Sequence, residues 1–500
     1  MLIWFLPVFL IFLMIGLPVF FGLLAAPGIL LFLSDLNAGA PDPTKQLTVL
    51  YRNVYNGMDS FPLMAIPFFM LAGELMNKGG ITTRLVEFSQ ALMGHLRGGL
   101  AHVNILSSIL FAGLSGSAVA DTSALGSMLI PAMEKQGYTR KFAAAITAAS
   151  SVIGPIIPPS GIMIIYAYVM GESVAALFLA GIVPGILVGV GLMLVVRLMA
   201  DKYDLPKAER IVKRGAEMSK TEAFTSFAVL RLALGGLLMW IVTSLTGLEA
   251  TGATAWLTLL VCIVAVDLGL RQMRKAVSDD FRLVCKKAVL PLMTPVIIMG
   301  GILAGVFTPT EAAAIAVFYA LIIGFLVLRT LTFRELGDVL SRAAMTSAVV
   351  LLLVGAAMAF KTVVSLSYAP QILADLILSL SENPYILLFL INVLLFIVGM
   401  FLDAGPAIII LGPILGPIFT DLGVDSIHFA IIMSVNLTVG LATPPMGLVL
   451  FVASSVSGER VETIAKAILP FLAVEILVIF LITYIPAISM TIPRLTGFVQ

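Results

Sequence analysis

The segment from Gly113 to Gly161 reads GLSGSAVADTSALGSMLIPAMEKQGYTRKFAAAITAASSVIGPIIPPSG, and it decides the fold of the chain. Its first break is polar, formed by Ser115, Gly116 and Ser117, and the apolar runs beside it are too short to span separately. A spanning helix needs about 20 apolar residues. Irregular backbone at membrane depth is tolerated only inside protein or along a watery cavity. We therefore predict a re-entrant hairpin, two short helices that enter and leave on one side.

A second break follows in the same segment, from Gly154 to Gly161. It contains three prolines in the middle of an apolar run, Pro155, Pro158 and Pro159. Proline lacks a backbone donor and clashes with the preceding helical turn. A helix that crosses the membrane here must therefore be interrupted.

This segment has a counterpart 286 residues further along the chain. The matching residues are glycines and prolines, since Pro131, Gly137, Gly154, Pro158, Pro159, Gly161 and Pro184 fall on Pro417, Gly423, Gly440, Pro444, Pro445, Gly447 and Pro470. Chance predicts roughly half of one such match in this window, so we interpret the pattern as an internal repeat. Paired interrupted helices in corresponding halves are the best sequence indication of a transporter's binding site.

Composition restricts the class of protein. The 500 residues are 60% hydrophobic and 11% charged, with a mean hydropathy of +1.11, which excludes a soluble globular protein and predicts a polytopic helical membrane protein. No basic cluster indicates a nucleic-acid partner. Cys262 lies in an apolar run and Cys285 in a basic segment, so we expect no disulfide. The first residues lack a basic region and a cleavage site, which predicts a retained helix, crossing once or twice within 2–34.

Basic residues predict the topology. Six segments carry 24 of the 29 Lys and Arg residues, namely 78–97, 134–141, 197–220, 271–287, 329–342 and 458–466. By the positive-inside rule these segments are cytoplasmic. Four segments carry none and are expected on the far side, namely 169–175, 247–253, 366–384 and 418–430. The first hairpin then opens to the cytoplasm and the second, around Asp403, to the far side. Such inverted repeats are typical of alternating-access carriers.

We divide the chain into five parts on this basis. Parts 1–97 and 289–384 are first and second scaffold and arm segments. Parts 98–199 and 385–490 are transport repeats, each with a hairpin and an interrupted helix. Part 200–288 holds basic loops and two additional apolar segments, at about 228–247 and 253–270. In part 289–384, Thr308, Pro309 and Glu311 predict a capping box.

Two acids lie in or beside the predicted hairpin tips, Asp121 and Asp403. An ionisable group at membrane depth is costly and indicates function by default. The alternative is that each caps a helix by accepting hydrogen bonds from free N–H groups. For Asp121 both interpretations stay open, and for Asp403 we favour binding.

Polar residues around the breaks are candidate ligands. Ser115 and Ser117 offer hydroxyl and N–H donors to an anionic group, although small residues also serve helix packing. Oxygen-bearing residues precede each Pro-Pro break and suit a small hard cation, namely Ser150, Ser151 and Gly154, and Asn436, Thr438 and Gly440. Ser160 and Thr443 flank the breaks and are candidates to face substrate.

Several strings resemble the large membrane subunit of tripartite ATP-independent periplasmic (TRAP) transporters. They are FPLMAIPFFMLAGELM, RGGLAHVN, FAGLSGSAVADTSALGSMLIPAMEKQGY, TAASSVIGPIIPPSG, GVFTPTEAAAIAVFYA and TPPMGLVLFVASSVSGE. The resemblance implies an elevator-type carrier of the bacterial inner membrane, a symporter in which a sodium gradient drives import of organic acids such as C4-dicarboxylates or sialic acids. It also implies a periplasmic binding protein and a small four-helix membrane subunit.

By this resemblance, Ser115, Ser117, Ser160 and Asp403 would face substrate. Sodium would be held with the hairpins by the two breaks, from Ser150 to Pro158 and from Asn436 to Pro444. The departure from the family is at about 200–288, which looks longer than usual and contains the two additional segments.

Other classes are less consistent with the residues. The main alternative is a stand-alone sodium- or proton-coupled anion carrier of a related elevator fold, working without a binding protein. An intramembrane hydrolase needs a Ser–His or paired-Asp site, and no histidine is close in sequence to Ser115 or Ser117. The chain has no Walker A motif, which argues against ATP drive. A purely structural scaffold would not need two broken helices. We therefore expect a transporter and not an enzyme.

Overall fold

The computed structural model describes residues 5–37, 45–201, 205–206, 218–246, 253–273, 277–366, 379, 381 and 383–499. Every regular element within these ranges is helical. In this described part, nine helices are long and apolar enough to cross a membrane. The predicted class, an all-α polytopic membrane protein, is confirmed.

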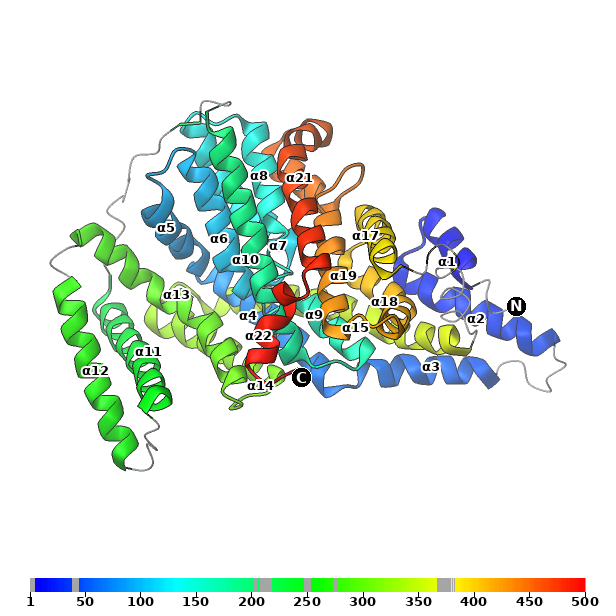
Figure 1. Ribbon diagram of the computed structural model, residues 1–500, viewed down its shortest axis with the longest axis horizontal. Helices are drawn as coiled ribbons and strands as arrows, with labels where there is room; N and C mark the ends of the chain where they lie inside the picture. The colour runs from blue at the N-terminus through cyan, green and yellow to red at the C-terminus, as the bar shows by residue number, and fades with distance from the viewer. Residues whose placement is uncertain are drawn as a thin grey trace.

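Two sets of five helices form the centre of the molecule (Figure 1). The first set is α6 (Gly99–Ser115), α7 (Ala118–Lys135), α8 (Arg140–Ser151), α9 (Gly161–Met170) and α10 (Val174–Met199). The second set is α17 (Pro384–Phe401), α18 (Ala404–Asp421), α19 (Ser426–Gly440), α20 (Leu448–Ser457) and α21 (Val461–Tyr484). Adding 286 to the bounds of α7, 118 and 135, gives those of α18, 404 and 421. The repeat seen in the glycines and prolines is therefore a repeat of helices.

The two sets pack on each other reciprocally. Within each set the first hairpin helix packs on the first half of the broken helix, α6 on α8 and α17 on α19. Between the sets, α7 packs on α20 and α18 packs on α9. Each second hairpin helix thus contacts the second half of the other repeat's broken helix, which is the pattern of a pseudo-twofold arrangement.

Both hairpins and both breaks form where the sequence predicts them. The first hairpin turns at Gly116, whose φ of +61° is the left-handed conformation that glycine adopts readily. Helix α6 has 17 residues, about 26 Å at 1.5 Å per residue, which falls short of the ~30 Å hydrocarbon core. The broken helices lose regular structure over 152–160 and 441–447. Both breaks contain a cis peptide bond, Pro158–Pro159 and Pro444–Pro445.

The remaining helices flank this centre. On one side lie α3 (Lys45–Met58), η2 (Phe61–Met64), α4 (Ala65–Lys78), α14 (Pro309–Leu321) with η3 (Ile322–Val327), and α15 (Phe333–Leu366). Helix α15 packs on α3, α4 and α2 (Val19–Asn37), and α1 (Phe5–Met14) packs on α2. Helix α5 (Ile81–Met93) packs on α13 (Asp279–Leu303), and the short α22 (Ala487–Leu495) packs on α10. The five-part division of the chain stays a prediction.

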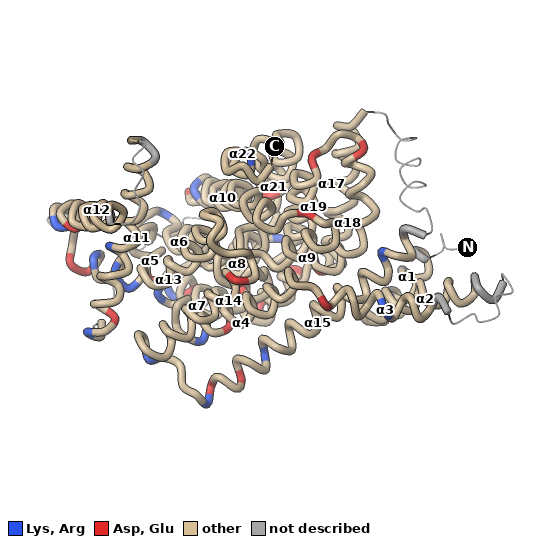
Figure 2. The backbone as a smooth tube through the Cα atoms, turned by 90° about the horizontal axis from the view of Figure 1, so that it is seen from below, with Lys and Arg blue, Asp and Glu red and all other residues tan. Residues whose placement is uncertain are grey.

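The two additional apolar segments form α11 (Lys220–Thr246) and α12 (Ala253–Met273), which pack on each other. Figure 1 shows this pair at the opposite end of the molecule from α1–α3. Lys and Arg residues gather at this same end, around α5 and α11–α13 (Figure 2). Much of the predicted linker 197–220 and of the segment 247–253 lies outside the described residues.

One local expectation differs from the structure. The segment 271–287 was expected to be a basic loop, but α12 continues to Met273 and α13 begins at Asp279. Arg282 and Lys286 therefore lie on a helix. Apolar residues recur there at helical spacing, with Phe281, Cys285 and Val289 on one face, and this pattern favours a helix over a loop. The capping box at Thr308 is confirmed.

Candidate binding site at the hairpin tips

The first hairpin tip lies against the first break. A Cβ atom at Gly116 would be only 2.8 Å from the carbonyl oxygen of Pro159 and 3.5 Å from the amide nitrogen of Gly161. Real Cβ atoms do not approach a carbonyl oxygen so closely, so this position needs glycine for contact as well as for its φ. The tip of the hairpin and the start of α9 are consequently in direct backbone contact.

The three predicted serines are brought together here. Ser117 is the N-cap of α7 and accepts a hydrogen bond from the Ala120 amide, at 3.4 Å. Its own amide donates to the Ser115 hydroxyl, at 3.2 Å. Ser160 is the N-cap of α9, accepts from the Met163 amide at 3.4 Å, and is fully buried. These hydroxyls therefore fix helix starts as well as facing the break.

Asp121 is not a helix cap, because Ser117 holds that position. Its side chain is fully buried, and neither carboxylate oxygen makes a hydrogen bond of ordinary geometry within the described part of the chain. The Ser115 hydroxyl interacts with it. A Cβ at Gly154 would lie 2.3 Å from its Oδ2 atom. The carboxylate thus rests on the backbone of the first break, which excludes the capping interpretation and leaves a buried acid without a strong partner.

Asp403 is an N-cap. Its Oδ1 atom accepts a hydrogen bond from the Ala404 amide at 2.8 Å, at the start of α18. The residue is exposed, so a cap and a ligand role are compatible, and binding by Asp403 stays a prediction. The second tip also contacts its own break, because the Gly447 amide donates to the Met400 carbonyl at 3.1 Å.

Four helix N-termini meet at these tips. Gly116 places the start of α7 against the start of α9, as described above. A Cβ at Gly405 would lie 3.7 Å from Ile165, and one at Gly416 would lie 2.4 Å from Met170. Helices α9 and α18 therefore run in the same direction, with their first turns side by side. The Met400–Gly447 contact adds the start of α20 to the group.

The remaining candidates of the second repeat lie at the end of α19. Gly440 crosses Gly399 so closely that a Cβ at Gly440 would be 2.5 Å from the Gly399 Cα atom. Thr438 and Thr443 are buried, and each donates its hydroxyl to the carbonyl four residues earlier, at 2.6 and 2.9 Å. Their hydroxyl lone pairs remain available to a cation. Pro444, like Pro158 in the first break, begins the cis bond that follows.

Two asparagines that the sequence did not single out join the hairpins to the broken helices. Asn104 on α6 accepts from the Ser150 hydroxyl at 3.1 Å, and its amide donates to Thr147 at 2.6 Å. On α17, Asn392 accepts from the Asn436 amide at 2.6 Å. Ser150 and Asn436 are equivalent in the repeat, since 150 + 286 = 436. Ser151 donates to the Thr147 carbonyl at 2.7 Å. These partners were missed because an Asn inside an apolar run indicates nothing until its neighbour is known.

The arrangement suits two kinds of ligand. Free N–H groups and the helix dipole make converging N-termini attractive to an anion. The C-terminal ends of α8 and α19, with carbonyls freed at the breaks, suit a small cation. A buried carboxylate without a partner is costly unless a cation balances it, and Asp121 is such a group.

The fold and these paired sites define a class, the helical membrane carriers built from two related repeats with broken helices. The family described as the tripartite ATP-independent periplasmic transporter, DctM component, matches residues 6–276 and 252–488. The chain belongs to this family. It is accordingly a multi-pass inner-membrane component of a transporter, and not an enzyme.

Named relatives support the assignment. The chain is 39% identical over 97% of its length to the uncharacterized protein YgiK of Salmonella typhimurium, of which it covers 96%. It is 36% identical over 89% of its length to the sialic acid TRAP transporter large permease protein SiaM of Vibrio cholerae, of which it covers 89%. The C4-dicarboxylate TRAP transporter large permease protein DctM of Pseudomonas aeruginosa is 34% identical, with 95% of this chain and 94% of the relative covered.

A solved structure shares the fold. The crystal structure of the Alcanivorax borkumensis YdaH transporter, described as having an unusual topology, has a TM-score of 0.55 and 16% sequence identity. The match covers 91% of this chain and 89% of that one. At this identity the likeness concerns the fold alone.

Proposed function

We propose that this chain is the large permease of a sodium-coupled importer of an organic acid. The acid is delivered by a periplasmic binding protein, and the chain works together with a small four-helix membrane subunit. The observation that carries the proposal is the meeting of four helix N-termini, those of α7, α9, α18 and α20, at the two hairpin tips.

The substrate class follows from the charge that this site favours. N-termini with unpaired N–H groups stabilise a negative group such as a carboxylate. Relatives are named for sialic acid, C4-dicarboxylate and 2,3-diketo-L-gulonate, and all three compounds are acids. Ser115 and Ser117 would donate to the carboxylate at the first tip. Asp403 would accept from substrate hydroxyls or amides at the second, away from the acid group.

Sodium coupling rests on the first break. Asp121 supplies a buried carboxylate against Gly154, and the freed carbonyl groups of the break from Ser150 to Pro158 add neutral oxygens. The second break, from Asn436 to Pro444, supplies hydroxyl and carbonyl oxygens without an acid. A hard cation such as sodium fits both sets of ligands. Sodium binding would pull each hairpin tip onto its break and complete the site for the acid.

An elevator movement would carry the two repeats as one body past the flanking helices. Few polar contacts join the two parts: the Tyr168 hydroxyl on α9 donates to the Asn56 carbonyl on α3 at 3.5 Å. Lys361 on α15 donates to the Val169 carbonyl. Both contacts lie at the C-terminal end of α9 and would break during such a movement.

Uptake into proteoliposomes tests the proposal. The chain is reconstituted with the small subunit, and a panel of radiolabelled organic acids is offered with and without the binding protein. We expect uptake of an acid only when sodium is higher outside and the binding protein is present. Uptake that is unchanged without the binding protein would support the stand-alone carrier instead. Uptake that is unchanged without sodium would exclude the coupling.

A crosslink tests the movement. Asn56→Cys and Tyr168→Cys, in a chain with Cys262 and Cys285 changed to Ser, are joined by a bifunctional maleimide. We expect the crosslink to abolish uptake, whereas each single cysteine treated in the same way retains it. Full uptake by the crosslinked protein would contradict relative movement of α9 and α3.

A further inference from the structure

A pocket of about 330 Å³ lies between α11, α12 and α13, away from the hairpin tips. This volume is within the range of small-molecule sites, roughly 300–1,000 Å³. Its wall is largely apolar and includes Phe227, Leu230, Leu270, Phe281 and Leu292. Two cationic side chains complete it, Arg282 and Lys286. An apolar wall with a cationic edge is complementary to an anionic amphiphile.

The wall is held in place by a buried ion pair. Arg231 on α11 is 6% exposed and donates from Nε to Asp267 on α12, at 2.8 Å. Its guanidinium also donates to the Phe227 carbonyl at 3.1 Å and lies 3.2 Å from the centre of the Phe227 ring. These contacts engage Arg231 within the protein, so it shapes the pocket and joins α11 to α12. The ligand is left to the other two cations.

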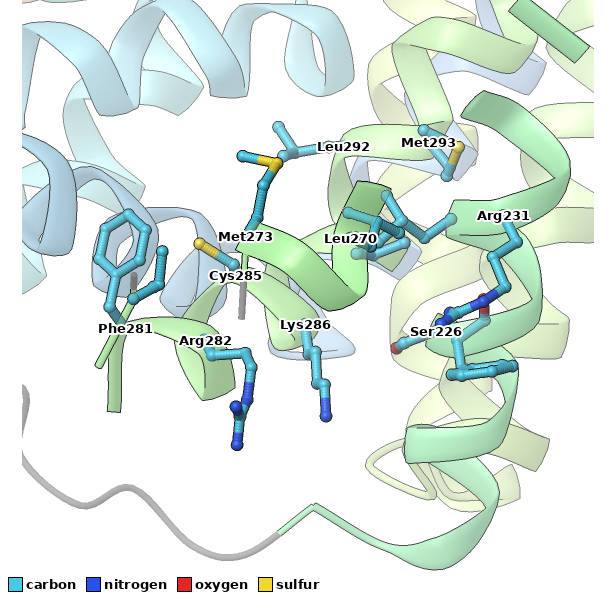
Figure 3. A pocket seen from close by; sticks show the side chains of 14 residues that line it. Ser226, Arg231, Leu270, Met273, Phe281, Arg282, Cys285, Lys286, Leu292 and Met293 are labelled. Carbon is cyan, nitrogen blue, oxygen red and sulfur yellow. The ribbon is translucent and has the colours of Figure 1, made fainter. Parts of the chain in front are cut away.

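Arg282 and Lys286 are four residues apart on α13 and therefore lie on one helix face. Figure 3 shows their side chains next to each other, extending in the same direction. Arg282 pairs with Asp279 at 2.6 Å, but the Asp279 side chain is 85% exposed. Exposed pairs of this kind contribute little and can be exchanged for a stronger anion. Two adjacent cations can thus contact one phosphate group.

The position within the membrane fits a lipid headgroup. The segment 271–287 carries six Lys and Arg residues, and the positive-inside rule places it at the cytoplasmic surface. The apolar wall continues from there along α11 and α13 toward the bilayer interior. Basic pockets between helices on the cytoplasmic side are suited to acidic lipid headgroups.

We propose that this pocket binds one anionic phospholipid from the cytoplasmic leaflet. The phosphate contacts Arg282 and Lys286, and an acyl chain lies along Leu230, Leu270 and Leu292. Helix α11 packs on α12, α13 and η3, so the lipid joins the additional helix pair to the flanking helices of the carrier. This site is separate from the hairpin tips and does not depend on the proposed substrate or on sodium.

Cys285 lines the pocket and reports on its occupancy (Figure 3). In a Cys262→Ser background, delipidated protein in detergent is labelled with N-ethylmaleimide after addition of phosphatidylglycerol, phosphatidylcholine or inorganic phosphate. We expect phosphatidylglycerol to slow labelling at least about fivefold, and the other two additions to leave it unchanged. Equal protection by phosphatidylcholine would show ordinary lipid contact and overturn the proposal.

A charge-removal pair gives the second test. Arg282→Gln with Lys286→Gln should weaken phosphatidylglycerol binding, measured by native mass spectrometry, about tenfold or more, given the attraction per Lys or Arg near an anionic headgroup. The matched control changes Lys135 and Arg334, two cytoplasmic cations away from the pocket, and should bind as the unchanged chain does. Equal binding by both variants would overturn the proposal. So would protection of Cys285 by the small membrane subunit in lipid-free detergent, because a protein helix would then fill the pocket.

Discussion

The two hairpin tips share one backbone design and differ in where they carry an acid. Asp403 occupies in the second repeat the position of Ser117 in the first, since 117 + 286 = 403, and both residues are helix N-caps. Asp121 has Ala407 as its equivalent, since 121 + 286 = 407. The first tip thus has a neutral cap and a buried acid one turn further on. The second has an acidic cap and an alanine below it.

This difference separates the two roles that a coupled carrier needs. A buried carboxylate against the Gly154 backbone has no strong protein partner, and a small cation would satisfy it. An exposed carboxylate at an N-cap is already stabilised by a backbone N–H group and can accept from a hydroxyl as well. We infer that the first tip contributes more to sodium binding and the second more to substrate specificity.

The largest expected effect comes from Asp121→Asn. The substitution keeps the shape of the side chain and removes the charge that would balance sodium. We expect sodium-driven uptake to fall about a hundredfold, the upper end of what the loss of one supporting group costs a metal site. The control is Glu134→Gln, an exposed acid at the other end of α7, which should transport normally. Normal uptake by the Asp121 variant would remove the distinction between the two tips.

Asp403→Asn should have a smaller effect. Asparagine also caps helices, so membrane insertion and folding should be normal. Uptake should fall at least about tenfold, equivalent to roughly 1.4 kcal/mol, while the sodium concentration for half-maximal uptake stays unchanged. Asp421→Asn, at the exposed end of the same helix, serves as the control. If Asp403→Asn shifted the sodium dependence and left substrate affinity intact, the roles assigned to the tips would be reversed.

The polar networks behind the tips should be alike in the two repeats. Asn104→Leu leaves Ser150 and Thr147 without a partner, and Asn392→Leu does the same to Asn436 and Thr483. Interhelical hydrogen bonds in membranes contribute about 1 kcal/mol. We expect each variant to lose about that much unfolding free energy, measured by denaturant titration in micelles. A loss confined to one repeat would show that the repeats are not equivalent in packing.

The smallest effect is expected at Thr438, in the second break. Thr438→Ala removes a hydroxyl oxygen from the proposed cation ligands but no charge. The sodium concentration for half-maximal uptake should rise about threefold, equivalent to roughly 0.6 kcal/mol. Thr420→Ala provides a matched control, because Thr420 makes the same hydrogen bond to the carbonyl four residues earlier on α18. An unchanged sodium dependence would assign Thr438 to packing.

The backbone design was readable from the sequence because glycine and proline act locally. Gly116 and the Pro158–Pro159 pair break helices wherever they stand, and the structure follows them closely. The capping box at Thr308 is local in the same sense. The fold class and the hairpins could therefore be predicted without any knowledge of packing.

The site could be predicted only in part, because its details depend on contacts between distant segments. The sequence left the role of Asp121 open, since capping is decided by which residue begins the helix, and Ser117 does. Asn104 and Asn392 gave no signal, because their partners lie on other helices. The start of α13 was placed too late, because charge indicated a loop where the apolar spacing supports a helix.

Direct sodium binding tests the central claim without knowledge of the substrate. Binding of ²²Na⁺ to the purified chain is measured by scintillation proximity for the unchanged protein, Asp121→Asn and Asp403→Asn. We predict saturable binding to the unchanged protein and to Asp403→Asn, and strongly reduced binding to Asp121→Asn. Saturable binding that survives Asp121→Asn in full, or its absence from the unchanged protein, would contradict the assignment of the first tip to sodium.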